Sequence, residues 1–444
     1  MNLIYGIKDR PKFAQMLLFA FQQVLAILAA TILVPAIINN SCEGVNMSQS
    51  AALFGAGVGT LVYQLFTKFK SPVFLGSSFA FIASMCAAFA GAASAAAGYA
   101  GIIIGAALAG LVYVIIAVVI KAVGVKWLNK LMPPVVIGPT VAIIGMSLAG
   151  NAVADLTVGR VAGCSPYVAL ICGLVTLFAV IIISVYGKKM AKLIPFVLGI
   201  LTGYVVASIF TVIGILTSNP ALQVIDFSVF QNMTIFAVPD FTFVKAIEGV
   251  KEVDLSFIAT VAVAYVPVAF VVFAEHIADH KNLSSIIGQD LLEEPGLHRT
   301  LLGDGVGSIA GALFGGCPNT TYGESVGCVA ITKNASVITI TTAAIMCIVI
   351  SFFGPFVTFL ASIPNCIMGG VCVTLYGFIA CSGLKMIQQV DLNQNKNLFV
   401  VAVILITGIG GLSVSFGQVT LTSIACALIL GIITNAVVNK GKEE

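Results

Sequence analysis

The chain consists largely of long apolar stretches, and this feature limits its fold more than any other. Hydrophobic residues make up 59% of the 444 positions and charged residues 9%, whereas soluble domains carry roughly 25% charged residues. A helix needs about 20 consecutive apolar residues to cross a bilayer, and backbone hydrogen bonds inside the bilayer have to be made internally. The sequence therefore predicts an all-α polytopic membrane protein.

Fourteen crossings can be counted along the chain, some of them short. They cover residues 13–38, 49–67, 73–91, 98–120, 133–152, 165–186, 193–216, 256–280, 298–316, 319–333, 335–360, 364–383, 397–414 and 419–438. The first is longer than the roughly 7–15-residue apolar core of a signal peptide and is interpreted as a retained span. With both termini in the cytoplasm, all but Arg160, Lys245 and Lys251 of the 21 Lys and Arg residues fall in cytoplasmic loops, in agreement with the positive-inside rule.

A polar connection divides the chain into two halves with seven predicted spans each. The halves are residues 1–216 and 256–444, and the connection, 217–255, is predicted to lie outside the cytoplasm and to contain a surface amphipathic helix within 241–254. Because an odd number of spans returns the chain to the opposite side, the second half enters the membrane inverted. Inverted repeats of this kind are common in transporters.

The third span of each half begins with a similar interruption. Residues 72–78 read Pro-Val-Phe-Leu-Gly-Ser-Ser, and residues 318–323 read Pro-Asn-Thr-Thr-Tyr-Gly. Irregular backbone at membrane depth is tolerated where it is buried in protein or lines a cavity, and two broken spans at matching positions indicate a binding site. Both helix starts would then present free N–H groups near the midplane. The alternative is that 319–333 is only a loop.

Four acidic residues lie in or beside apolar stretches, where an ionisable side chain marks a functional site by default. They are Glu275, Asp279, Asp304 and Glu324. Glu275 and Asp279 are four residues apart and share one helix face, although the helix can equally leave the membrane at Glu275. Asp304 has two equally supported interpretations: a carboxylate at a helix start, where the helix dipole favours negative charge, or a functional residue. The three histidines are expected at span ends, in contact with solvent, and Gln22 and Gln23 are expected to bind neighbouring helices.

Other classes of function find little support in the sequence. The net charge of +3 comes from short flanks and gives no basic face for nucleic acid. The eleven cysteines form no CxxC pair and no metal-ligand spacing, and we find no nucleophile paired with a base. We therefore expect a protein that is not an enzyme and that needs no cofactor or metal.

Several motifs together resemble the nucleobase/ascorbate transporter family, also called nucleobase:cation symporters 2. They are Ala274-Glu-His-Ile-Ala-Asp279, Pro295-Gly-Leu-His-Arg299, Gly303-Asp-Gly-Val-Gly307, Pro318-Asn-Thr-Thr-Tyr-Gly-Glu324, Gly76-Ser-Ser-Phe-Ala-Phe81 and Ala30-Thr-Ile-Leu-Val-Pro35. The resemblance implies fourteen segments in two inverted repeats, with short strands in segments 3 and 10. It also implies a core domain of segments 1–4 and 8–11, a gate domain of segments 5–7 and 12–14, and pairing of two copies through their gate domains.

The resemblance also implies a binding site and a mechanism. Glu275 and Glu324 would accept hydrogen bonds from a nucleobase, most closely uracil, and the backbone N–H groups of Phe79 and Gly323 would meet its carbonyls. The remaining substrate-binding candidates are Tyr322, Tyr376 and Ala30, and the proton-coupling candidates are Asp279, Asp304, Glu275 and Gln23. We expect a proton-coupled importer in the bacterial cytoplasmic membrane, working by alternating access.

At three positions the chain departs from the family pattern, which limits how far the residue roles implied by the resemblance apply to it. Asp279 and Gln23 stand where some uracil carriers have His, and Ser325 stands where the family signature has Asn. Glu rather than Gln at position 324 favours a pyrimidine as substrate. Asp at position 279, in contrast, also resembles xanthine carriers. The alternatives are therefore a xanthine or purine carrier of the same family and an anion exchanger of the same fold.

Overall fold

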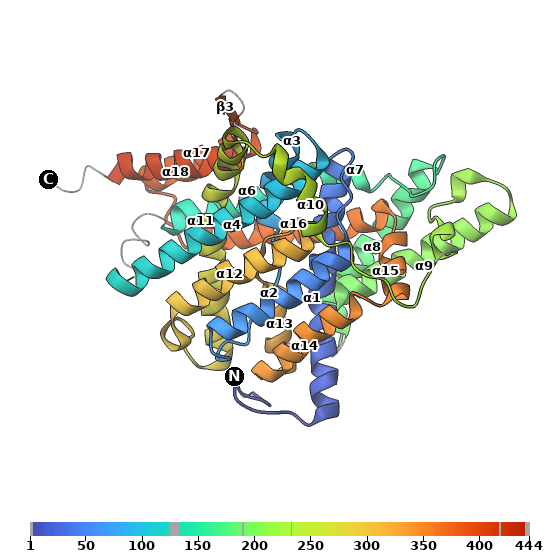
Figure 1. Ribbon diagram of the computed structural model, residues 1–444, viewed down its shortest axis with the longest axis horizontal. Helices are drawn as coiled ribbons and strands as arrows, with labels where there is room; N and C mark the ends of the chain where they lie inside the picture. Colours follow the sequence, from blue (N-terminus) through green and yellow to red (C-terminus); the bar gives the residue numbers. More distant parts are fainter. Residues whose placement is uncertain (1–2, 125–132, 189–190, 232, 417–418, 440–444) are drawn as a thin grey trace.

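The structure, a computed structural model, describes residues 3–124, 133–188, 191–231, 233–416 and 419–439. Five lysines that were predicted to be cytoplasmic lie outside the described residues: Lys126, Lys130, Lys189, Lys440 and Lys442. Helices dominate the described chain, as predicted (Figure 1). Seven of the described helices are long and apolar enough to cross a membrane, and four more apolar helices are shorter. The count of fourteen crossings stays a prediction.

Helices and strands occur in both predicted halves and in the predicted connection between them. The first half contains α1 (Phe13–Ser41), α2 (Gln49–Phe66), β1 (Leu75–Ser77), η1 (Phe79–Phe81), α3 (Ile82–Ala90), α4 (Ala95–Val123), α6 (Pro134–Ser147), α7 (Ala149–Asp155), α8 (Pro166–Tyr186), η2 (Ala191–Leu193) and α9 (Pro195–Leu216). The connection contains η3 (Pro220–Leu222), η4 (Phe227–Phe230), α10 (Thr242–Gly249) and η5 (Val250–Glu252). The second half contains α11 (Leu255–Ile287), η6 (Leu292–Gly296), α12 (Leu297–Gly315), β2 (Asn319–Thr321), α13 (Gly323–Thr332), α14 (Val337–Ile350), α15 (Gly354–Ser362), α16 (Asn365–Ile387), α17 (Asn395–Ile409), β3 (Val414–Phe416), β4 (Val419–Leu421) and α18 (Ser423–Asn439).

Three predicted boundaries were wrong. Residues 335–360 form two helices, because Pro355 in the first turn of α15 has no N–H and cannot continue α14. Residues 419–421 belong to a hairpin with β3, so α18 begins only at Ser423. Helix α11 does not end near residue 280 but continues to Ile287.

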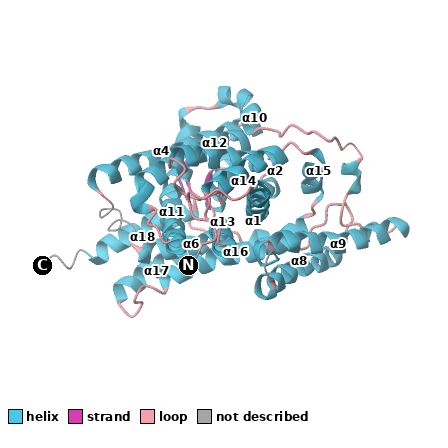
Figure 2. Ribbon diagram, turned by 90° about the horizontal axis from the view of Figure 1, so that it is seen from below, coloured by secondary structure: helices cyan, strands magenta, loops and turns pink. Residues whose placement is uncertain are grey.

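The two interrupted spans meet as a short antiparallel strand pair in the interior of the molecule (Figure 2). Gly76 of β1 lies opposite Thr320 of β2, so the interpretation of 319–333 as a loop was wrong. The strands are buried, and side chains of α2 satisfy the backbone beside β1. The Thr60 hydroxyl accepts from the Leu75 N–H at 2.9 Å, and the Gln64 amide donates to the Ser71 and Val73 carbonyls. Polar partners of this kind allow extended backbone at membrane depth.

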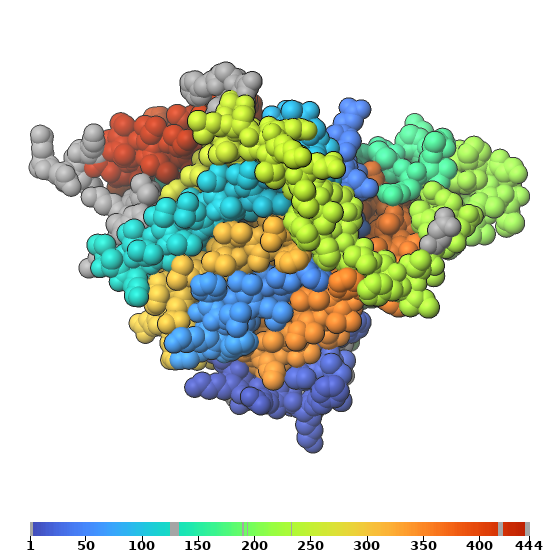
Figure 3. Space-filling view, in the orientation of Figure 1, coloured from blue at the N-terminus to red at the C-terminus, as the bar shows by residue number. Residues whose placement is uncertain are grey.

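Helix α12 packs tightly against both α2 and α4 beside the strand pair. Glycines make the α2–α12 contact close, since a Cβ on Gly55 would lie 2.5 Å from the Gly311 carbonyl oxygen. Figure 3 shows α2 lying between α12 and α14, although these helices are far apart in the sequence. A second group forms around α16, which packs against α6 and α8. The strand pair lies with the first group.

Candidate functional site

A cavity of about 380 Å³ lies between the strand pair, α11 and α13 on one side and α6, α9 and α16 on the other. Its size falls within the range of roughly 300–1,000 Å³ that is usual for small-molecule sites. Six residues predicted for the site line this cavity: Phe79, Glu275, Asp279, Tyr322, Gly323 and Glu324. The structure therefore brings together the two broken spans and three of the four acidic residues.

Two helix starts border the cavity. Helix η1, which leads into α3, begins at Phe79, and α13 begins at Gly323. Neither start has a side-chain cap: Ser78 and Tyr322 occupy the N-cap positions without a capping hydrogen bond. The first N–H groups of a helix have no acceptor within the helix, so both starts offer donors to a ligand. Because the strands pair, the two sets of donors are held at a fixed separation.

The carboxylates come from two elements. Glu275 and Asp279 lie one turn apart on α11, and Glu324 lies in the first turn of α13. The Thr321 hydroxyl donates to Asp279 Oδ2 at 2.6 Å, so strand β2 orients this carboxylate. Among the described residues, no Lys or Arg lines the cavity. The site is therefore rich in hydrogen-bond acceptors on the α11 side and in backbone donors at the helix starts.

The three predicted aromatic residues have different surroundings. Phe79 lines the cavity, and Tyr376 lies behind it, with the two ring centroids 6.1 Å apart in an edge-to-face contact. Tyr376 itself does not line the cavity. Tyr322 lies over the backbone of Gly76, and its hydroxyl donates to the Ser77 carbonyl at 2.8 Å. This contact fixes the residue that precedes α13.

Ala30 and Gln23 lie on α1 outside the cavity lining, and both are buried. The Gln23 amide donates to the hydroxyl and to the carbonyl of Ser325. Gln23 and Ser325 are two of the three positions at which the chain departs from the family pattern, and the structure places them in direct contact. They therefore form one altered pair that supports the first turn of α13.

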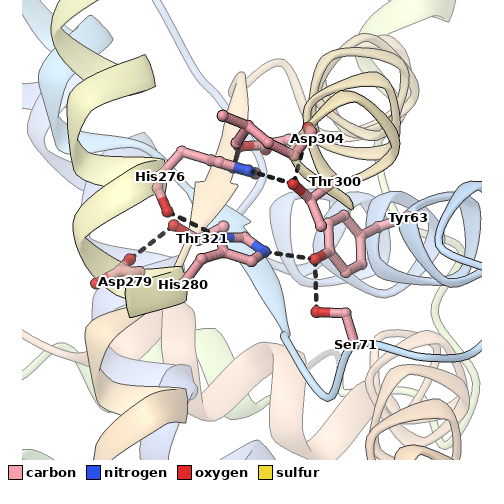
Figure 4. A network of polar contacts seen from close by, with 9 residues as sticks. Tyr63, Ser71, His276, Asp279, His280, Thr300, Asp304 and Thr321 are labelled. Atoms are coloured by element: carbon pink, nitrogen blue, oxygen red, sulfur yellow. Dashed lines mark hydrogen bonds and ion pairs between the residues drawn. The ribbon is translucent and has the colours of Figure 1, made fainter. Parts of the chain in front are cut away.

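Asp304 also lies outside the cavity, in a buried polar network (Figure 4). Its Oδ2 lies 2.7 Å from His276 Nδ1, and both side chains are fully buried. Asp304 is not in the first turn of α12, so its interpretation as a helix-start carboxylate was wrong. The expectation of solvated histidines was also wrong for His276 and His280, because α11 continues past them and packs its polar face on α2 and α12.

The opposite wall of the cavity was missed by sequence reasoning. It is formed by Val141 and Ile144 of α6, Phe196 of α9, and Leu375, Phe378, Ile379, Ser382 and Met386 of α16. Nearly all of these residues are apolar in apolar helices, so no sequence signal distinguished them. The cavity follows α16 toward its last turn, where Lys385 lies. The charge pattern predicts this end to be cytoplasmic.

Buried strands that lead into uncapped helices, together with carboxylates facing a cavity inside an apolar helical protein, define a membrane permease. The sequence profile of the Permease family (Xan_ur_permease) matches residues 14–416. The chain belongs to this family, which confirms the resemblance seen in its motifs.

Relatives in this family cover almost the whole chain. The uracil permease of Bacillus caldolyticus is 38% identical over 437 residues, which are 98% of this chain and 94% of the relative. The uracil permease of Bacillus subtilis (strain 168) is 38% identical over 99% of this chain and 96% of its own. The uracil permease of Escherichia coli (strain K12) is 32% identical over 96% of this chain and 92% of its own.

Solved structures with little sequence similarity share the fold. The transmembrane domain of a cyanobacterium bicarbonate transporter, BicA, matches with a TM-score of 0.59 and 15% identity over 97% of this chain and all of that chain. The murine anion transporter Slc26a9 matches with a TM-score of 0.66 and 13% identity over 97% of this chain and 69% of that chain. The predicted polytopic helical fold is therefore confirmed, and these neighbours say nothing about the substrate of this chain.

Proposed function

We propose that the protein is a proton-coupled symporter that imports uracil. The observation that carries the proposal is the meeting of Glu275, Glu324 and two uncapped helix starts in one cavity. Relatives at 32–38% identity that are named uracil permeases support the choice of base. Xanthine is the alternative substrate to be tested.

Uracil matches the groups that the cavity offers. The base is flat, with N–H donors and carbonyl acceptors alternating around its ring. Carboxylates accept hydrogen bonds from N–H groups, and backbone N–H groups donate to carbonyls. Glu275 and Glu324 would bind the N–H edge, and the N–H groups of Phe79 and Gly323 would bind the carbonyls. The Phe79 ring would pack on the base.

A proton is the natural partner in transport. Uracil is neutral and leaves the charge of a buried carboxylate uncompensated, which is costly in a low-dielectric site. Taking up one proton with the base removes that charge. Glu275 and Asp279 border the cavity, while Asp304 and Gln23 lie behind it, so these four remain the candidates for coupling.

Alternating access would move the core domain against the gate domain. The core would contain the group around α12 with the strand pair, and the gate would contain the group around α16. The cavity lies between them and extends along α16 toward the predicted cytoplasmic side, so we assign this arrangement to the inward-facing state. We further propose residence in the bacterial cytoplasmic membrane with both termini inside, and a homodimer formed through the gate domains.

Uptake by reconstituted protein tests the proposal. Proteoliposomes with an acidic exterior should accumulate labelled uracil, and dissipating the proton gradient should stop accumulation. Glu324→Ala should abolish uptake, whereas Glu248→Ala on the exposed face of α10 should not change it. Unlabelled uracil should compete better than xanthine, and sulfate or bicarbonate should not compete. Failure of wild-type protein to take up uracil, or full uptake by Glu324→Ala, would refute the proposal.

A further inference from the structure

A segment ahead of α1 pairs with the chain that leaves α13 (Figure 1). We call this segment, residues 3–9, the N-terminal strap; none of its residues lines the cavity. The N–H groups of Ile4 and Tyr5 donate to the Lys333 carbonyl at 2.8 and 3.3 Å, and the Ala335 N–H donates to the Tyr5 carbonyl at 2.9 Å. The proposed function assigns no role to these residues.

Two more hydrogen bonds extend the pairing to the start of α14. The Val337 N–H donates to the Ile7 carbonyl at 3.1 Å, and the Ser336 hydroxyl donates to the Asp9 carbonyl at 2.6 Å. Ser336 is fully buried and occupies the N-cap position of α14. Backbone groups of the strap are therefore satisfied by the turn that joins α13 to α14.

Apolar side chains add to this attachment. Leu3 and Ile7 of the strap pack against a small buried cluster that includes Leu75 of β1 and both Val326 and Val329 of α13. Close-packed interiors transmit displacements from one element to the next. The position of the strap is therefore coupled to the strand pair and to α13, which together border the cavity.

Helix α13 is short and depends on contacts at both of its ends. It has ten residues, Gly323–Thr332, and helices of this length are marginal without tertiary contacts. Strand β2 holds the end that carries Gly323 and Glu324. The other end stops at Lys333, whose φ of 55° lies in the left-handed region, which is unfavourable for a residue with a side chain. Because the Lys333 carbonyl accepts from the strap, the strap stabilises this strained end.

We propose that the N-terminal strap is a positioning element of the binding site, which holds α13 so that Gly323 and Glu324 keep the geometry that binds the base. This inference rests on the proposed function. Since the strap does not line the cavity, it acts only through α13. Weakening its attachment leaves the Lys333 end of α13 free to fray, and the base then binds less tightly. By linkage, binding of the base has to strengthen the attachment of the strap in return.

The affinity of the full-length protein for uracil tests this role. Ile4→Pro removes the N–H that donates to the Lys333 carbonyl. One ordinary hydrogen bond corresponds to a factor of about five in an equilibrium constant, so we expect the Kd for uracil to rise by about three- to fivefold. Ile4→Ala keeps this N–H and shortens a side chain that is mostly exposed, so it should bind as wild type does. Calorimetric titration measures both variants.

Hydrogen–deuterium exchange tests the reciprocal effect. Saturating uracil should slow exchange of the amides of Ile4, Tyr5 and Ala335 by about threefold or more, although the base does not contact the strap. A strap that only adds stability would exchange at the same rate with and without uracil.

Two serines of α14 separate positioning from general stability. Ser336→Ala removes the hydroxyl that donates to the strap, while Ser351→Ala removes an equally buried hydroxyl at the other end of α14, which donates to the Ile348 carbonyl at 2.6 Å. Both variants should lower the melting temperature, but only Ser336→Ala should raise the Kd for uracil, by about threefold. This comparison decides the outcome if Ile4→Pro does not fold.

Three results would overturn the inference: wild-type Kd in the strap variants Ile4→Pro and Ser336→Ala, an equal rise in Kd in Ser351→Ala, or exchange of the strap that uracil leaves unchanged. If wild-type protein binds no uracil, the proposed function itself fails, and the role of the strap falls with it.

Discussion

Gly76 offers a sharp test of how the strand pair positions the site. A Cβ at this position would lie 2.5 Å from Cε2 and Cζ of Tyr322. Carbon atoms pack best at roughly 3.5–4.0 Å, so the Gly76→Ala methyl group forces the ring to move by about 1 Å. Tyr322 is buried, donates to the Ser77 carbonyl, and directly precedes α13. A movement of this ring therefore displaces Gly323 and Glu324.

The size of the effect can be worked from these contacts. Overpacking a core costs about 1–3 kcal/mol, and breaking a buried hydrogen bond costs about 1–3 kcal/mol more. The two costs together are at least about 2 kcal/mol; with half of that falling on binding, the loss of about 1 kcal/mol corresponds to about fivefold weaker affinity. We therefore expect Gly76→Ala to raise the Kd for uracil by about fivefold or more and to lower the melting temperature by several degrees.

Calorimetric titration with uracil and thermal unfolding of the detergent-solubilised protein measure both quantities. Gly327→Ala is the matched control, because it lies in α13 and its Cβ would meet no atom within 4 Å. Combining Gly76→Ala with Tyr322→Leu, which removes the obstructing ring, should cost less than the sum of the two single changes. Wild-type affinity and melting temperature in Gly76→Ala would refute this account of the strand pair.

Three further outcomes follow from the contacts. Thr321→Val removes the donor to Asp279 and should lower uracil uptake, while Thr321→Ser keeps that donor and should restore most of it. Asn319→Ala removes the amide that donates to a backbone carbonyl of α2 and should lower the free energy of unfolding by about 1–3 kcal/mol, measured by thermal denaturation. The hydrogen bond from Lys70 lowers the pKa of Glu294, so this pair contributes stability above the ordinary pKa of Glu, and the contribution disappears as the pH falls through the lowered pKa. Since Glu294 is exposed, Glu294→Gln should leave the melting temperature nearly unchanged in 150 mM salt and show any small loss only near neutral pH.

The sequence was sufficient to predict the residues that line the cavity on the side of the strand pair, α11 and α13. Pro and Gly at the start of two apolar spans predict interrupted helices, and an acidic residue at membrane depth predicts function. Both rules use only the types of neighbouring residues and the apolar pattern of the span. They correctly located Gly323 and Glu324 at a helix start. The resemblance then placed Glu275 in the site, where the local pattern had left two interpretations open.

The buried histidines could not be predicted in the same way. His276 and His280 follow the apolar part of α11, and a polar cluster at that point is typical of a helix leaving the membrane. Their partners, Asp304 and Tyr63, lie on other helices, so only the packing reveals that the cluster is buried. The apolar wall from α6 and α16 was unpredictable for the opposite reason, because its residues are indistinguishable from lipid-facing or core residues.

The strand pair also determines where the chain can tolerate changes in length. Each strand has only three residues, and successive side chains in a strand point to opposite faces. Inserting one residue into β2 would turn the Thr321 hydroxyl away from Asp279 and shift the start of α13 relative to that of η1. These two tripeptides, one from each half of the chain, therefore have to keep their lengths together.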